Sequence, residues 1–190
     1  MAEQNEGART SETGGLIAGE IHVRGASVAD VSGQRIGLTQ CSARDVTSEE
    51  TRIVMSAAQS IRGRDVSAAA SAALQVDAHT AKLGGCAVGI VEADQVDARY
   101  SGTYAVMGEN VNLNSCWAQA AMAKEQMRIE RSAVGVAAAR QIEATDVRAG
   151  FLVAREVRGT VRTLFDTRAA AVFGAAFGAA FAAVWLLRRR

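Results

Sequence analysis

Apolar and small side chains recur at every fifth position over most of this chain. Counting from Ile21, the series runs through Cys116 without a charged residue, and a second aliphatic residue often follows two positions later, as in Ile21 with Val23 and Ile36 with Leu38. Residues i and i+2 of a strand lie on one face. A period of five matches neither a helix nor a plain alternating strand. The pattern therefore predicts a β-solenoid in which each five-residue unit is one short side followed by a corner.

Sorting these positions by residue type indicates the number of sides per coil. A spacing of 15 residues separates two columns of mostly β-branched residues from one column of small residues, whereas a spacing of 20 mixes the types. The columns are Val31, Val46, Ile61, Val76, Val91 and Val106; Ile21, Ile36, Thr51, Val66, Ala81, Val96 and Val111; and Ala26, Cys41, Ser56, Ser71, Cys86, Ser101 and Cys116. Residues 16–164 are therefore predicted to be an all-β domain, a single-stranded, three-sided parallel solenoid with about 15 residues per coil.

The five-residue frame shifts by one residue after Cys116, beside Trp117. It resumes at Met122 and continues through Met127, Ser132, Ala137, Ile142, Val147, Leu152 and Val157. A bulge at a corner accommodates one inserted residue. We therefore expect Met122 and the residues that follow it in this series to point inward.

The segment 169–187 is apolar and contains no charged side chain. A helix of this length spans about 28 Å, close to the thickness of a bilayer's hydrocarbon core. We predict a transmembrane helix here; a buried cap helix or an oligomerisation helix in water are the alternatives. Its small-residue stripe is expected to pack against other membrane helices, and the residues flanking the span are expected at the membrane interface. The stripe is Ala170, Gly174, Gly178 and Ala182, and the interface residues are Trp185, Arg168, Arg188, Arg189 and Arg190.

The remaining segments complete the expected organisation. Residues 1–15 are polar and are expected to be a disordered lead, 165–168 a short linker and 188–190 a basic tail. The lead has no apolar run of the kind found in a secretory signal. Arg155, Arg158, Arg162 and Arg168 precede the span, which favours a membrane-anchored protein whose solenoid is cytoplasmic and whose tip is translocated. The terminal triplet 188–190 favours the opposite orientation.

Charge and candidate chemistry point away from catalysis and from nucleic acid. The formal net charge is +1, and no aromatic ladder accompanies the arginines, so no nucleic-acid partner is expected. The three cysteines lie whole coils apart, too far for a disulfide or a shared zinc ion, and are expected to be core residues. His22 and His79 are expected to point outward into solvent. We expect no catalytic, cofactor-binding or metal-binding residues, and no enzyme activity.

Stretches such as GEIHVRGASV and EADQVDAR, with their short strands and three sides per coil, resemble bactofilins, the bacterial polymer-forming β-helix proteins. The resemblance covers the repeat from about residue 19 to residue 164. It implies a scaffold that polymerises without a nucleotide and associates with the cytoplasmic membrane. Pentapeptide-repeat proteins have a similar spacing, but their coil has four sides, which the 15-residue columns argue against.

The sequence therefore favours a non-enzymatic, tail-anchored scaffold or tether. Its expected partners are the lipid bilayer, further copies of itself through its ends or its membrane helix, and proteins that dock on the solenoid. One alternative is a soluble, oligomeric β-helix binding module with a buried C-terminal oligomerisation helix. Another is a solenoid enzyme of the acyltransferase type, which would require a period of six and a catalytic histidine at a subunit interface.

Overall fold

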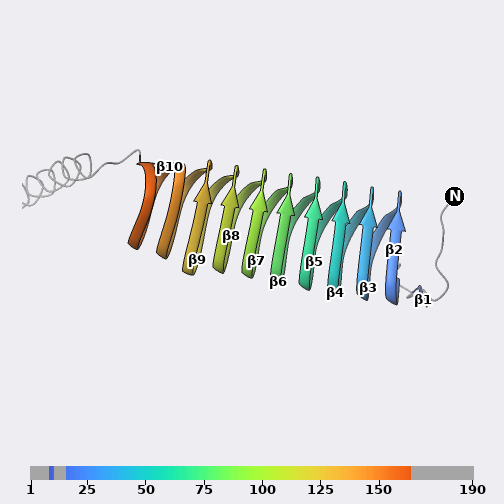
Figure 1. Cartoon of the computed structure of the whole chain (residues 1–190). Helices are drawn as coiled ribbons and strands as arrows, with labels where there is room; N and C mark the ends of the chain where they lie inside the picture. Colours follow the sequence, from blue (N-terminus) through green and yellow to red (C-terminus); the bar gives the residue numbers. More distant parts are fainter. Residues whose placement is uncertain (1–8, 11–15, 164–190) are drawn as a thin grey trace, which may run out of the picture.

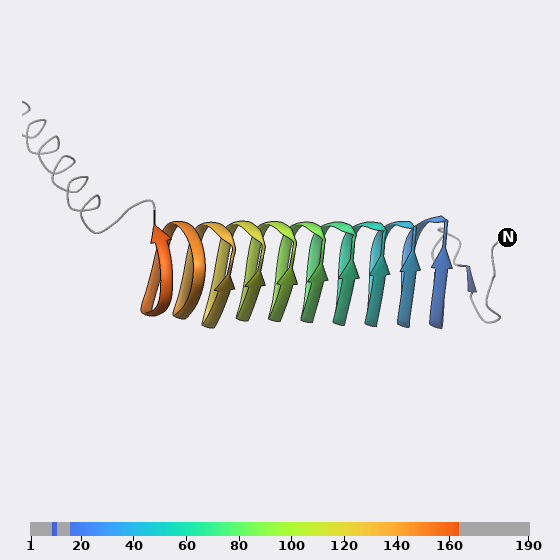
Figure 2. The same cartoon turned by 45° about the horizontal axis from the view of Figure 1, so that its top comes forward.

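The computed structural model describes residues 9–10 and 16–163, and every regular element in these ranges is a β-strand. Nine parallel strands form a β-solenoid of about eight turns, in which each strand pairs with the next one along the chain (Figures 1 and 2). This confirms the predicted all-β solenoid. The strands are β1 (Arg9–Thr10), β2 (Leu16–Arg24), β3 (Ser27–Thr39), β4 (Ser42–Val54), β5 (Ala57–Ala69), β6 (Ala72–Gly84), β7 (Ala87–Arg99), β8 (Gly102–Asn114), β9 (Trp117–Glu130) and β10 (Ala133–Thr163).

The strand register gives each coil 15 residues and three sides. Val31 of β3 lies opposite Val46 of β4, and Val46 lies opposite Ile61 of β5. The ladder between β3 and β4 skips Arg44 and Glu49, where the chain turns a corner. In β4 the three paired segments are residues 42–43, 45–48 and 50–54. We name the corresponding sides of the rod the short, middle and long faces.

The third corner of each coil, between the long and short faces, has a left-handed backbone. One residue per coil has a positive φ there, although most of these residues carry a side chain and an L-residue in this conformation costs about 1 kcal/mol. The column comprises Gly25, Gln40, Met55, Ala70, Gly85, Tyr100, Ser115, Arg131 and Asp146. This corner closes each coil and returns the chain to the start of the next one.

The core consists of the predicted inward columns. Both β-branched columns are buried from end to end, and the small column is buried from Cys41 to Cys116. Ala26, its first member, is exposed because it lies at the N-terminal end of the rod. A coil of this size has no hydrophobic core of its own, so each inward side chain packs on the coils before and after it.

Serine hydroxyls and cysteine thiols of the small column form hydrogen bonds with backbone groups at the left-handed corner. The Ser101 hydroxyl donates to the carbonyl of Arg99 (2.9 Å) and accepts from the backbone N–H of Cys86 (3.2 Å). The Cys86 thiol donates to the carbonyls of Gly84 (3.4 Å) and Ala68 (3.3 Å). The small column is therefore a buried hydrogen-bond ladder as well as a packing column.

The frame shift lies later in the chain than the sequence indicated. Ala121 is fully buried (0% exposed) and Met122 is 50% exposed, so the expectation that Met122 points inward is wrong. Gly108 lies opposite Ala123, whereas Asn110 lies opposite Gln126, which places the extra residue of β9 between these pairs. This is the corner between the middle and long faces, where an added polar residue projects into solvent.

The columns resume after this bulge and end with the rod. The predicted inward residues that are buried are Met127, Ser132, Ala137, Ile142 and Val147. Leu152 is half-buried and Val157 is exposed, because they belong to the last described coil. At the other end, Arg9 and Thr10 of the expected lead form β1, which pairs antiparallel with Ile17 and Leu16.

Candidate interaction surfaces

The described residues contain no cluster that resembles a metal centre. No group of three or more His, Cys, Asp or Glu side chains in residues 9–10 and 16–163 is arranged to hold a metal ion. Cys41, Cys86 and Cys116 are free and buried, as predicted. Burial also raises the pKa of the Cys116 thiol, which disfavours its reactive thiolate form.

Both histidines are exposed, as predicted. His79 lies at the corner between the middle and long faces, where its Nδ1 is 2.5 Å from Oδ2 of Asp94, one coil further along the rod. Both side chains are about half exposed or more. The pair is therefore a solvated contact between neighbouring coils.

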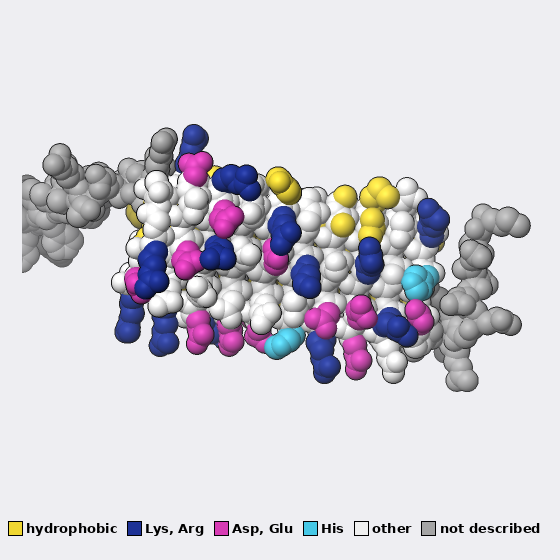
Figure 3. All heavy atoms as spheres, in the orientation of Figure 1, with side chains coloured by type: hydrophobic (Ala, Val, Ile, Leu, Met, Phe, Trp, Pro, Cys, Tyr) yellow, Lys and Arg dark blue, Asp and Glu magenta, His cyan; other side chains and the backbone are white. Residues whose placement is uncertain are grey.

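The long face is polar. Figure 3 views it and shows Lys and Arg side chains interspersed with Asp and Glu along the rod. Several charges are paired between neighbouring residues, as in Arg128 with Glu143 (2.8 Å) and Arg99 with Asp97 (3.2 Å). These pairs are exposed, so each contributes little to stability, but together they leave the face with little net charge.

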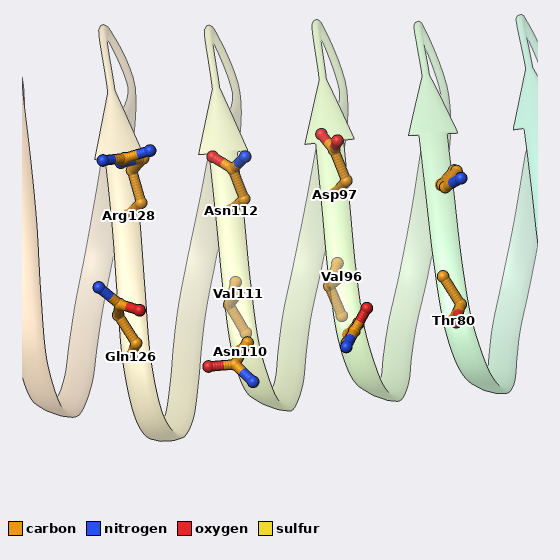
Figure 4. Close-up of a pocket in the computed structure, with 10 residues that line it drawn as sticks. Thr80, Val96, Asp97, Asn110, Val111, Asn112, Gln126 and Arg128 are labelled. Carbon is orange, nitrogen blue, oxygen red and sulfur yellow. The ribbon is translucent and has the colours of Figure 1, made fainter.

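A shallow groove of about 450 Å³ runs across the long face over β6 to β9. Two rows of outward side chains line it, separated by buried Val96 and Val111. Figure 4 shows side chains of both rows projecting from successive strands. The rows are Thr80, Gln95, Asn110 and Gln126, and Lys82, Asp97, Asn112 and Arg128. The groove is rich in amides and offers a regular array of hydrogen-bond donors and acceptors.

The short face is a trough of small residues. Its outward positions are mostly serine, alanine and glycine until Trp117, and a shallow depression follows them over the first coils. Ser42, Ala57, Ala72 and Ala87 lie along its floor. Side chains this small present neither charge nor bulk to a ligand, so we assign the trough no role.

The middle face changes character along the rod. In β3 to β6 its outward residues are polar, whereas from β8 to the end of β10 they are all apolar. The polar part comprises Asp30, Ser32, Asp45, Thr47, Ser60, Arg62, Gln75 and Asp77; the apolar part, which we name the apolar patch, comprises Ala105, Met107, Ala120, Met122, Val136, Ala138, Phe151 and Val153. The large side chains of the patch are between 37% and 65% exposed.

Sequence reasoning missed this patch, although a signal was present. Each patch residue lies directly before or after an inward position of the first β-branched column or its continuation. Reading these outward neighbours separately from the inward column would have identified the change after residue 105.

The predicted membrane residues lie outside the described part of the chain. Those positions are Arg168, Ala170, Gly174, Gly178, Ala182, Trp185, Arg188, Arg189 and Arg190. Within the described ranges there is no helix long and apolar enough to cross a bilayer. The transmembrane helix therefore stays a prediction from sequence.

No family model, no curated protein and no solved structure matches this chain. The rod, its surfaces and the sequence that follows it are therefore what points to a function.

Proposed function

We propose that this protein is a non-enzymatic scaffold or tether, anchored in a membrane by residues 169–187 and presenting the solenoid as a rigid rod. The observation that carries the proposal is the continuous core of the rod. Its inward columns are filled from Ile21 to Ala149 by residues of the solenoid itself. An apolar segment of 19 residues (169–187) is therefore not required to complete that core, and a bilayer is the environment in which such a segment is stable.

The rod suits a mechanical rather than a chemical task. Each coil is hydrogen-bonded to its neighbours throughout, so distances along the rod are fixed at about 4.8 Å per coil. The long face, with its amide-rich groove and paired charges, is the surface we propose for protein partners. We place the rod in the cytoplasm, because arginines precede the membrane segment.

Self-assembly is part of this proposal, in line with the resemblance to bactofilins. Within the described residues, only Leu16 and Ile17 of β2 pair with a strand on its outer side. The remaining backbone groups at this edge, and those of the last coil of β10, are a template for a strand from another copy. Rods stacked end to end through these edges would continue the same ladder.

Fractionation of the full chain tests the anchor. We expect the full-length protein to pellet with membranes, to resist extraction at high pH and to be released by detergent. A chain ending at residue 168 is expected in the soluble fraction, because the described core lies upstream of that point. A full-length chain with Phe177→Arg and Gly178→Arg is the matched control, since two charges at the centre of the span oppose insertion.

The alternative architecture predicts a different result. If residues 169–187 form an oligomerisation helix in water, the full-length protein stays soluble without detergent and elutes as a larger species than the truncated chain. That outcome would overturn the anchor. Electron microscopy of the truncated rod addresses assembly separately: filaments are expected, and discrete particles at every concentration would remove end-to-end stacking.

A further inference from the structure

The apolar patch is an interaction surface that the scaffold function does not by itself explain. Its outward positions form two rows on the middle face, with Ala105 opposite Ala120 and Met107 opposite Met122. Val136 and Ala138 continue the rows in β10. A contiguous apolar surface rimmed by polar residues is the kind of surface through which a protein contacts a partner or a membrane.

The edges of the patch have the residues of a membrane interface. Lys124, Arg140 and Arg155 lie with Glu109 and Glu125 along the corner between the middle and long faces. Lys124 is paired with Glu109 (3.7 Å), so three cations against two anions leave this edge with one excess positive charge. Basic side chains beside an apolar surface favour anionic headgroups.

Aromatic residues flank the opposite edge. Tyr104 lies at the corner between the middle and short faces, and Trp117 follows on the short face; both are exposed. Tyrosine and tryptophan are enriched where protein meets the headgroup region, because one part of the ring system is apolar and the other is polar.

The polar half of the same face has the opposite charge. Asp30, Asp45 and Asp77 project from it, against the single cation Arg62. An anionic membrane surface would repel the polar N-terminal half of the middle face. By charge, only the C-terminal half of this face is therefore suited to contact such a surface.

The position of the patch agrees with the proposed anchor. The last coil of the patch contains Phe151 and Val153, and the described chain ends soon after, at Thr163. Five residues, 164–168, separate this end from the predicted span. Five extended residues reach at most about 18 Å, so an inserted span would hold this end of the rod close to the bilayer.

The area of the patch distinguishes a lipid surface from a second copy of the chain. Four coils at about 4.8 Å, each about 13 Å wide on this face, give roughly 250 Å². A stable interface between two proteins buries about 800 Å² on each partner. A surface this small binds a partner weakly on its own, but a tether that holds it beside the bilayer raises its effective concentration there.

We propose that the apolar patch lies on the surface of the anionic leaflet in which residues 169–187 are anchored, so that the C-terminal half of the rod contacts the bilayer through its middle face. This inference rests on the proposed anchor. It adds a second membrane contact, made by strands, and fixes which face of the rod is turned away from the cytoplasm. The long face stays open to protein partners.

Site-specific quenching tests the inference on the full chain. Single cysteines at Ala120→Cys, in the patch, and Gln126→Cys, on the long face of the same strand, are labelled with an environment-sensitive dye. The native cysteines are buried in the folded protein and are not expected to react. The chain is reconstituted into vesicles of phosphatidylcholine and phosphatidylglycerol with and without brominated acyl chains.

We expect a blue shift and quenching by brominated lipid for the dye at position 120 and neither for the dye at position 126. Adding Met107→Glu and Met122→Glu should abolish the quenching at position 120 while the protein still floats with the vesicles. Asn112→Glu together with Thr80→Glu, on the long face, makes the same change in charge and is the matched control; it should leave the quenching unchanged.

The outcomes separate this inference from the anchor. Flotation without quenching at position 120 overturns the membrane contact of the patch and leaves the anchor in place. Energy transfer between labelled copies without quenching by lipid identifies a second copy as the occupant and also overturns it. Failure of the full chain to float overturns the anchor and, with it, the inference.

Discussion

Replacing Leu113 with alanine tests whether the stacked columns carry the stability of the rod. Leu113 is fully buried (0% exposed) on the inner side of β8. It lies opposite Ala98 in the preceding coil and Ile129 in the following one. With Leu113→Ala, two alanines would follow each other in this column, and the neighbouring coils are too firmly hydrogen-bonded to close the gap.

The expected cost follows from this environment. The substitution removes three buried carbon atoms, each of which contributes about 0.8 kcal/mol of hydrophobic transfer free energy, so about 2.4 kcal/mol is lost. A cavity that collapses only in part adds about 1–2 kcal/mol. The free energy of unfolding should therefore fall by about 3.4–4.4 kcal/mol.

Leu74 provides the control with the same chemical change. It projects from the corner between the short and middle faces and is 66% exposed, so Leu74→Ala should change the stability by less than about 0.5 kcal/mol. Both variants are compared with the parent chain in one detergent solution by urea unfolding, followed by the circular dichroism of the β-sheet. Equal midpoints for the two variants, or a loss below about 1 kcal/mol for Leu113→Ala, would refute the column-packing argument.

Three further predictions concern single sites. The Thr103 hydroxyl is buried without a hydrogen-bond partner among the described residues, and Val88 occupies the same position one coil earlier. Thr103→Val should therefore raise the free energy of unfolding, measured with urea, by about 1 kcal/mol. A lower free energy of unfolding would indicate that the hydroxyl has a hydrogen-bond partner. At the left-handed corner, a Cβ added to Gly85 meets no atom within 4 Å, so Gly85→Ala should lower the unfolding free energy by about 1 kcal/mol through its positive φ alone. Ala70→Gly removes a Cβ from the same conformation and should raise the melting temperature. If both substitutions change the stability in the same direction by the same amount, the positive φ is not a source of strain. Burial raises the pKa of the Cys116 thiol above its ordinary value of 9.0, so the folded state retains a proton that the unfolded state loses; stability from this source is complete below pH 9.0 and falls as the pH rises through the folded-state pKa. Cys116→Ser should reduce this fall in the unfolding midpoint, and an unchanged pH profile would count against it.

The solenoid could be predicted from the sequence because each inward column is dominated by one type of residue. The first inward column is β-branched at every position from Val31 to Val106, so the 15-residue period is visible without any structural information. The predicted position of the frame shift was wrong for a physical reason. Ala121 and Met122 are adjacent and both apolar, so the five-residue pattern alone does not show which of them points inward. The inserted residue itself lies among polar side chains at a corner, where nothing in the five-residue pattern marks it.

The conformation of the corners was also beyond prediction. Only one corner per coil is left-handed, and residues such as Gln40, Met55 and Tyr100 occupy it where glycine would be expected. The strain at these positions is compensated by stacking on neighbouring coils, which a single-sequence pattern does not reveal. The apolar patch was missed for a different reason: its alanines and methionines are also common in cores, and only the register separates outward from inward positions.

The uniform 15-residue register has a consequence for how such a rod changes over evolutionary time. Every coil from β4 to β7 presents the same backbone ladder to the coil before and the coil after it. Duplication or deletion of one complete coil in this range would therefore restore the backbone ladder at the new junction. The height of the rod would change by about 4.8 Å. The length of the solenoid could therefore change in discrete increments while both of its ends stay the same.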